Sequence, residues 1–245
     1  DVTGDGIPDI ATTDDEGCLT LFDADGTTHW VTPSCGTDPY MMLTAADLYG
    51  DGTPELITLE GIYEGTTGDK LETIGRDMRA VYSSPTVGDI DLDGEQEIIL
   101  ANRVWNPDGT LAWETLDHMG TYGHWSAIIN ADADPEAEIV MVGAGRMVVY
   151  EHDGTVIRDS DAGDIAASPI CAADFDGDGD TEVAWASKGA FHVYDLDGKE
   201  VWRRSISDIS GLSGCSGYDI DGDGAYEIMY ADEKTFYIYD GKTGT

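Results

Sequence analysis

The chain has 245 residues, of which 41% are hydrophobic, a share that is ordinary for a globular protein with a sizeable core. Its 50 Asp and Glu against 12 Lys and Arg give a net charge of −38, which argues against nucleic acid or an anionic membrane as a partner. No apolar run approaches the ~18 residues of a membrane helix. The chain opens on Asp1 without a start Met or signal segment, so we expect a processed or truncated piece of a longer protein.

One nine-residue stretch, 174–182 (DFDGDGDTE), is the unit around which the sequence repeats. Carboxylates at its first, third and fifth positions and an acid at its ninth form an oxygen cage for a hard cation, and calcium is the expected ion. The Gly at the sixth position permits a sharp turn, and the seventh residue can add a backbone carbonyl. An EF-hand would place its acid at position twelve, where Trp185 stands. Short apolar runs of strand type flank the stretch, so it predicts a strand, calcium loop, strand unit.

This loop recurs six times, starting at residues 1, 47, 89, 130, 174 and 219. The spacing of 41 to 46 residues is the period of a four-stranded propeller blade, and helical periodicity is absent. We therefore predict an all-β fold, a β-propeller of four-stranded blades, as a single domain over 1–245. The predicted repeat units are 1–40, 41–78, 79–120, 121–163, 164–208 and 209–245.

The third unit predicts the four strands of a blade at 83–89, 97–101, 103–106 and 110–113. A repeated Asp-Gly-x-x-x-Trp turn ends at Trp30, Trp113 and Trp202. These Trp residues are expected to pack on outer strands, and the alternative is that they are ligand platforms. The first unit starts inside its loop and lacks a first strand, while the last lacks a fourth. We therefore expect an incomplete ring of seven or more blades, completed by sequence absent here or by another chain.

The six loops, with leaders such as 84–91 (SPTVGDID), resemble the FG-GAP/VCBS repeats of integrin alpha-subunit-like calcium-binding propellers, over essentially the whole chain. The resemblance implies up to six structural Ca²⁺ ions, each held by side chains at positions one, three, five and nine and by the carbonyl of position seven. The alternative is a solvated acidic turn without metal. The implied ligands are Asp1, Thr3, Asp5, Ile7 and Asp9; Asp47, Asp51, Thr53 and Glu55; Asp89, Asp91, Asp93, Glu95 and Glu97; Asn130, Asp132, Asp134, Glu136 and Glu138; Asp174, Asp176, Asp178, Asp180 and Glu182; and Asp219, Asp221, Asp223, Ala225 and Glu227.

Two loops depart from the family pattern. Tyr49 occupies the third position of the second loop, and the fourth loop begins with Asn130 and has Pro135 in place of Gly. We expect these two loops to bind metal weakly or to be ordered without it.

The four cysteines form no C-x-x-C pair, which argues against zinc, and strand-rich secreted chains favour disulfides. Three connectivities are possible. Cys171 and Cys215 each lie just before an acidic loop on neighbouring first strands, so we expect them to pair, which leaves Cys18 with Cys35. Four buried thiols are the alternative.

In the family, the calcium loops share one face, so the connections between blades open on the opposite face, where propellers usually bind partners. Two of these connections collect basic and aromatic side chains that suit carbohydrate or carboxylate recognition. The candidate ligand-binding residues are Arg76, Arg79, His118, Tyr122, His124 and Trp125. The alternative is ordinary connections with packed aromatic residues.

Two classes of function fit these sequence features. The favoured one is a non-enzymatic extracellular or cell-surface module that binds glycan or protein partners without membrane insertion. The rival is a polysaccharide-active enzyme, because some rhamnogalacturonan lyases are built on calcium-loaded propellers of similar repeats. The sequence contains no Ser-His-Asp or metal-hydrolase motif, and we assign no catalytic residue. The acidity also fits a salt-adapted source.

Overall fold

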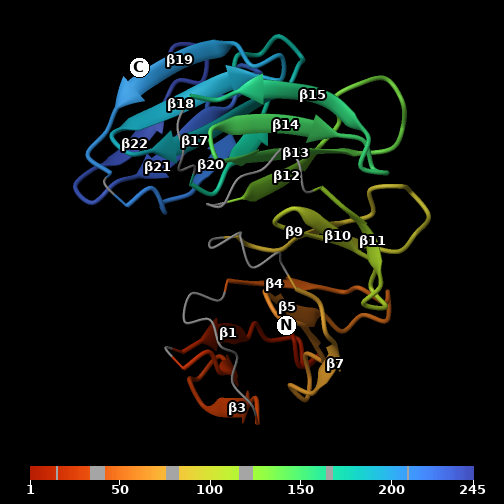
Figure 1. Ribbon diagram of the computed structural model, residues 1–245. Coiled ribbons are helices and arrows are strands. Elements are labelled where there is room, and N and C mark those ends of the chain that lie inside the picture. The colour runs from red at the N-terminus through yellow and green to blue at the C-terminus, as the bar shows by residue number, and fades with distance from the viewer. Residues whose placement is uncertain (15, 34–41, 76–82, 116–123, 164–167, 209) are drawn as a thin grey trace. The chain divides into compact units, whose positions relative to one another are not determined.

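The structure is a computed structural model that describes all residues except 15, 34–41, 76–82, 116–123, 164–167 and 209. The described residues form two compact units, the first ending at Glu114 and the second beginning at Thr115. In the part of the chain that the structure describes, every regular element is a β-strand (Figure 1). Among these residues no helix is long and apolar enough to cross a membrane.

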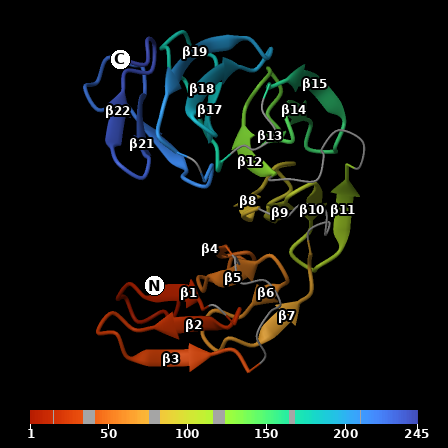
Figure 2. The same cartoon turned by 60° about the vertical axis from the view of Figure 1, so that its left-hand side comes forward.

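The first unit contains three antiparallel sheets in which consecutive strands are neighbours (Figure 2). The first sheet has three strands, and the other two have four each. The strands are β1 (Ile10–Thr13), β2 (Leu19–Phe22) and β3 (Thr28–Val31); β4 (Leu43–Ala46), β5 (Glu55–Thr58), β6 (Ile62–Tyr63) and β7 (Lys70–Glu72); and β8 (Thr86–Gly88), β9 (Glu97–Leu100), β10 (Arg103–Trp105) and β11 (Leu111–Glu114).

The second unit repeats this arrangement with two four-stranded sheets and a final three-stranded one. Its strands are β12 (Trp125–Ile129), β13 (Glu138–Gly143), β14 (Arg146–Tyr150) and β15 (Val156–Asp161); β16 (Cys171–Ala173), β17 (Glu182–Ser187), β18 (Ala190–Asp195) and β19 (Glu200–Ser205); and β20 (Cys215–Tyr218), β21 (Glu227–Ala231) and β22 (Phe236–Tyr239).

These sheets confirm the predicted blades. The four strands β8 to β11 lie where the third unit predicted them, and the first and last sheets lack the strands that the sequence lacks. Second strands such as β13 and β17 are buried at every position, because most of their side chains are apolar and both faces are covered. Outer strands such as β15 are partly exposed. The number of blades in the full ring stays a prediction, as does the single domain.

Two of the repeated Trp residues, Trp30 and Trp202, join the outer strand of one blade to the turn of the next. Trp30 on β3 donates its indole N–H to the carbonyl of Gly65 at 2.9 Å, and Trp202 on β19 donates to Gly241 at 2.6 Å. Trp202 is also buried against Phe191 and Tyr239. The structure therefore supports packing, rather than a ligand platform, for these two side chains.

Gly68 makes this contact possible in the first unit. It has a φ of +74° and lies so close to the Trp30 ring that a Cβ would stand 2.6 Å from a ring carbon. We predict that Gly68→Ala destabilises the protein by the roughly 1–2 kcal/mol of a left-handed non-Gly residue and by an additional steric cost. The matched control is Gly26→Ala, in the turn of the preceding blade, where φ is +84° and a Cβ would meet nothing within 4 Å. Equal losses in thermal melts of the two variants would contradict the steric argument.

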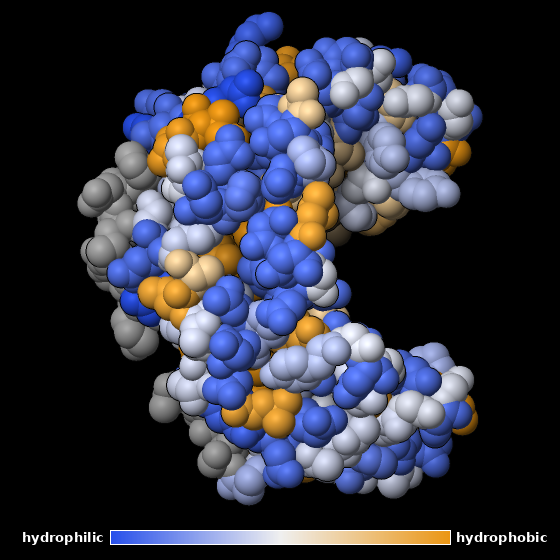
Figure 3. Space-filling model, turned by 90° about the vertical axis from the view of Figure 1, so that its right-hand side faces the viewer, coloured by the Kyte–Doolittle hydropathy of each residue, from blue (hydrophilic) through white to orange (hydrophobic). Residues whose placement is uncertain are grey.

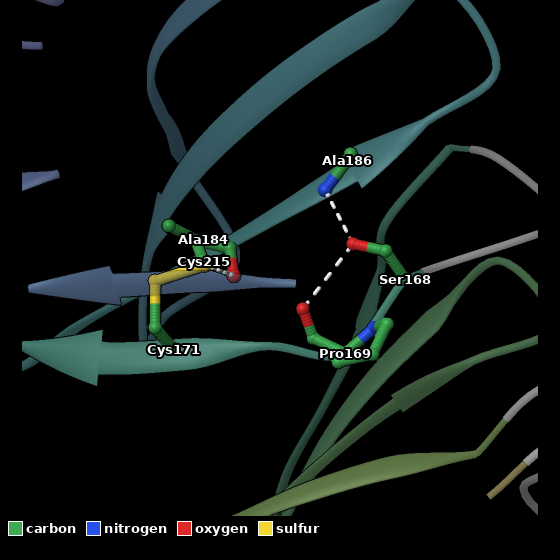
Figure 4. Close-up of a disulfide and its surroundings, with 6 residues drawn as sticks. All are labelled: Ser168, Pro169, Cys171, Ala184, Ala186 and Cys215. Atoms are coloured by element: carbon green, nitrogen blue, oxygen red, sulfur yellow. Dashed lines mark hydrogen bonds between the residues drawn. A yellow bond between two sulfur atoms is a disulfide. The ribbon is translucent and has the colours of Figure 1, made fainter. Parts of the chain in front are cut away.

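The predicted bridge between neighbouring blades is present. Cys171 on β16 and Cys215 on β20 form a disulfide with their Cα atoms 5.6 Å apart (Figure 4). Beside it, the hydroxyl of Ser168 accepts the backbone N–H of Ala186 at 2.8 Å, which ties the leader of this blade to its second strand (Figure 4). The second predicted pair includes Cys35, which lies outside the described residues.

Candidate metal centres

The six acidic loops share one anchoring hydrogen bond. In each, an oxygen of the position-nine acid accepts the backbone N–H of position two, which leaves its second oxygen free to face the loop. The pairs are Val2 to Asp9 at 2.7 Å, Leu48 to Glu55 at 2.9 Å, Ile90 to Glu97 at 3.0 Å, Phe175 to Glu182 at 2.8 Å, Ile220 to Glu227 at 2.8 Å, and Ala131 to Glu138.

A second bond closes five of the loops. The first-position Asp accepts the N–H of the sixth-position Gly, as in Gly179 to Asp174 at 3.0 Å and Gly224 to Asp219 at 3.2 Å. Gly179 has a φ of +98°, so a residue with a side chain would be strained there. This is the turn that the sequence predicted for the sixth position. Pro135 has no N–H, so the fourth loop cannot form this bond.

Three loops bring carboxylates together as the sequence predicted. Positions one, three and nine each offer an oxygen, and within each loop these oxygens lie within 4.8 Å of one another. The groups are Asp89, Asp91 and Glu97; Asp174, Asp176 and Glu182; and Asp219, Asp221 and Glu227. One oxygen of Asp89 is buried and accepts no hydrogen bond, a deficit that a cation would fill. Three clustered carboxylates fit a hard divalent cation, so several of these loops could hold a metal ion.

The fifth-position acids are arranged differently. Asp93, Asp178 and Asp223 lie outside these groups, and one oxygen of each accepts the N–H of position seven at 2.8 to 2.9 Å. The second oxygen of Asp223 lies 3.5 Å from the ammonium nitrogen of Lys242. Their role as metal ligands therefore stays a prediction, as does that of the position-seven carbonyls.

Neither of the first two loops gathers three carboxylates among the described residues, because position three is Thr3 in one and Tyr49 in the other. The Tyr49 hydroxyl donates a hydrogen bond to the carbonyl of Pro107 in the neighbouring blade, at 3.2 Å. This side chain therefore bonds to the neighbouring blade, and the weak metal binding expected of the second loop stays a prediction.

The fourth loop gathers a set that sequence reasoning missed. Asp132 and Asp134 lie with Glu151, which follows β14 and stands outside the nine-residue loop. The signal was in the sequence, since an acid or amide stands before the hairpin turn of every blade. Only the structure shows that this one reaches the loop.

Burial shapes the charge of the fifth loop. Glu182 is 2% exposed, and this burial, followed by the charge of Asp176, raises its pKa to about 7. Burial raises the pKa of Glu97 and Glu55 in the same way. Without a cation, Glu182 therefore favours its protonated form below about pH 7.

We predict that the chelated protein is more stable at pH 5.5 than at pH 8. Because the folded pKa of Glu182 lies above its ordinary value of 4.5, the folded chain holds this proton more tightly than the unfolded chain, and stability falls as pH rises from about 4.5 through 7. Between pH 5.5 and pH 8 this loss of stability from Glu182 is about 2 kcal/mol. Thermal melts in chelator at pH 5.5 and pH 8 measure this loss of stability. In Glu182→Gln the difference in melting temperature between the two pH values should be smaller. A difference of the same size in that variant would show that Glu182 is not its source.

A cavity of about 800 Å³ lies beside the fourth and fifth loops in the second unit. Arg158 and Lys199 are the basic side chains that line it. The acids outnumber them and include Asp132, Asp176, Asp178, Asp180, Glu182, Asp195, Asp197 and Glu200. The cavity is therefore suited to cations or to neutral hydroxyl groups rather than to acidic ligands.

Four members of the predicted ligand patch, Arg76, Arg79, His118 and Tyr122, lie outside the described residues. The other two lie at the start of β12 and are buried, with His124 3% and Trp125 1% exposed. Trp125 thus presents no open ring face to a sugar in this structure. The patch remains a prediction, and its described members are core residues.

The blades and their acidic loops define the class of this protein as a β-propeller with candidate metal-binding loops. A family model described as FG-GAP-like repeat matches residues 1–58 and 174–230. These two regions are therefore similar to FG-GAP-like repeats, as their loops indicated. No protein of curated function matches the sequence.

Solved structures confirm the propeller fold. The V. cholerae biofilm matrix protein Bap1 is 16% identical with a TM-score of 0.83, and the match covers 100% of this chain and 67% of that one. A lectin from Agrocybe aegerita that recognises non-reducing terminal N-acetylglucosamine is 16% identical, with a TM-score of 0.54 and coverage of 100% and 76%. The exotype rhamnogalacturonan lyase YesX is 15% identical, with a TM-score of 0.53 and coverage of 100% and 66%.

Proposed function

We propose that this protein is an extracellular, calcium-stabilised β-propeller that binds glycan or protein partners. The observation that carries the proposal is the gathering of three carboxylates at each of several equivalent loops. Like charges at this spacing repel one another, and a hard cation compensates them and couples its binding to folding. Nothing in this arrangement requires a reaction.

Three further features support the location and the role. The Cys171–Cys215 disulfide fits an oxidising compartment. The surface in Figure 3 is mostly hydrophilic, with hydrophobic residues in small groups, as suits a heavily solvated protein. Bap1 is a biofilm matrix protein and the Agrocybe protein is a lectin that recognises N-acetylglucosamine, so a matrix protein and a sugar-recognising protein both have similar folds.

The last sheet supports a longer ring. Its exposed apolar side chains are Tyr218 and Phe236, each 64% exposed, and Ile238. Propeller blades bury such faces against their neighbours, and this sheet lacks its fourth strand. A further blade, from absent sequence or from another chain, is the partner that we propose for it.

The proposed function is tested by titrating the protein with calcium and then probing a glycan array with and without calcium. Saturable calcium binding together with calcium-dependent binding to a defined glycan or protein is the expected result. A variant with Asp91→Asn, Asp176→Asn and Asp221→Asn, first shown to be folded, should lose both. Partner binding that is indifferent to calcium in the parent would contradict the structural role of the metal.

The alternative is the propeller of a rhamnogalacturonan-lyase-like enzyme, which the likeness to YesX favours. A lyase forms an unsaturated product, so absorbance of the new double bond during incubation with rhamnogalacturonan separates the two functions. Product formation by the parent would replace the binding module with the enzyme as the better proposal.

A further inference from the structure

The fourth acidic loop lacks two features of the repeat, but a carboxylate from outside the loop joins its acids. Asn130 replaces the first acid, and Pro135 replaces the Gly whose N–H would anchor it. Yet Asp132 and Asp134 offer oxygens within 4.8 Å of each other and of one from Glu151, as tightly as the acids of the better loops. The third carboxylate comes from outside the loop.

Strand register explains how Glu151 reaches this place. In the β13–β14 pair, Ile139 lies opposite Tyr150. Extending this register by one residue sets Glu138 opposite Glu151, just beyond the end of β14, and opposed residues of antiparallel strands point to the same face. Glu138 is the position-nine acid of the loop, so Glu151 stands beside the place where a loop cation would lie.

In the other blades, the residue at the position of Glu151 makes different side-chain contacts. In each blade the carbonyl of this residue accepts the N–H of the turn Gly, as Glu151 does for Gly154. Elsewhere its side chain is bonded within the same hairpin: Asp23 to His29 at 3.1 Å, Glu64 to Thr66 at 3.1 Å, Asn106 to Thr110 at 2.9 Å, Asp195 to the N–H of Lys199 at 2.8 Å, and Asp240 to the N–H of Thr243 at 2.9 Å. Glu151 instead joins the loop acids.

A second observation points to a bound cation. Glu138 is fully buried, and while one of its oxygens accepts the Ala131 N–H, the other has no hydrogen-bond partner. A buried carboxylate oxygen without a partner is costly, and Glu138 belongs to the same loop as Asp132 and Asp134. A cation bound among them would remove both the unsatisfied oxygen and the repulsion.

We propose that the fourth loop is a site for a hard divalent cation of the calcium class, held by Asp132, Asp134, Glu138 and Glu151. Glu151 replaces the ligand that Asn130 no longer supplies as a carboxylate. This site was expected from its sequence to be weak or metal-free, and the replacement ligand reverses that expectation. The inference rests on the proposed calcium binding of the other loops only for the choice of ion.

The test is the number of calcium ions bound per chain, measured by equilibrium dialysis and metal analysis at saturating calcium. Glu151→Gln should lose one ion relative to the parent. The matched control is Asp195→Asn, the same position in the next blade, which keeps a side-chain acceptor for Lys199 and should lose none. Asp176→Asn, in the fifth loop, should lose one ion and shows that the method resolves a single site.

Retention of the full count by Glu151→Gln, while Asp176→Asn loses one ion, overturns the fourth-loop site and leaves the proposed function intact. A parent that binds no calcium overturns both. Because Glu151→Gln could fail to fold, the calcium affinity of Glu151→Asp provides a second test of the fourth-loop site. It keeps the charge but shortens the side chain, so one site should weaken by tenfold or more while the melting temperature in chelator is unchanged. Unaltered affinity in that variant also overturns the proposal.

Discussion

A chelator should lower the melting temperature of this protein by roughly 5 to 30 °C. At the affinities of ~0.1 to 1 mM that are usual outside cells, millimolar calcium contributes ~0.4 to 1.4 kcal/mol per site, and six sites sum to several kcal/mol. For a chain of this size each kcal/mol moves the melting temperature by roughly 2–4 °C. Removing the ions also leaves groups such as Asp174, Asp176 and Glu182 without compensation.

The measurement is a thermal melt in millimolar calcium and again after dialysis against EGTA. Magnesium at the same concentration is the control for ionic strength, and it should restore little of the loss, because it prefers a smaller, octahedral site. The same melting temperature with and without chelator would show that the acidic loops are ordered by their hydrogen bonds alone.

Removal of the Cys171–Cys215 disulfide should cost about 2–4 kcal/mol. The bridge closes a loop with a sequence separation of 44, for which the loss of unfolded-chain entropy corresponds to about 4 kcal/mol. The stabilisation measured for engineered disulfides is often smaller than this entropy predicts. The expected fall in melting temperature for Cys171→Ala with Cys215→Ala is therefore about 4 to 16 °C in calcium.

Ser216→Ala is the matched control for this variant, because it truncates an exposed side chain on the same strand, β20, and should change stability by less than about 0.5 kcal/mol. A double variant that melts with the parent would mean that the bridge is present but thermodynamically neutral. Loss of calcium binding in the double variant would instead mean that the bridge positions the loops beside it.

Much of this protein follows from its sequence, because the determining interactions are local. The loop at 174–182 carries its turn Gly, its anchoring acid and its carboxylates within nine residues, so spacing alone predicts the turn and most of the cluster. Six copies at one period predict the blades. The leaders of two neighbouring blades then placed Cys171 and Cys215 on adjacent strands, as the structure confirms.

Only the tertiary structure decides interactions between residues that are distant in the sequence. From the sequence, Tyr49 was a departure from the loop pattern and Trp125 a candidate ligand-binding residue. In the structure, Tyr49 donates a hydrogen bond to the next blade and Trp125 is buried in β12. Likewise, Glu151 is separated from every loop acid that it joins by the whole of β13 and β14, and strand pairing alone brings them together. The spacing of residues predicts the contacts that form within a single loop. Packing and strand register determine which side chains meet across strands and blades.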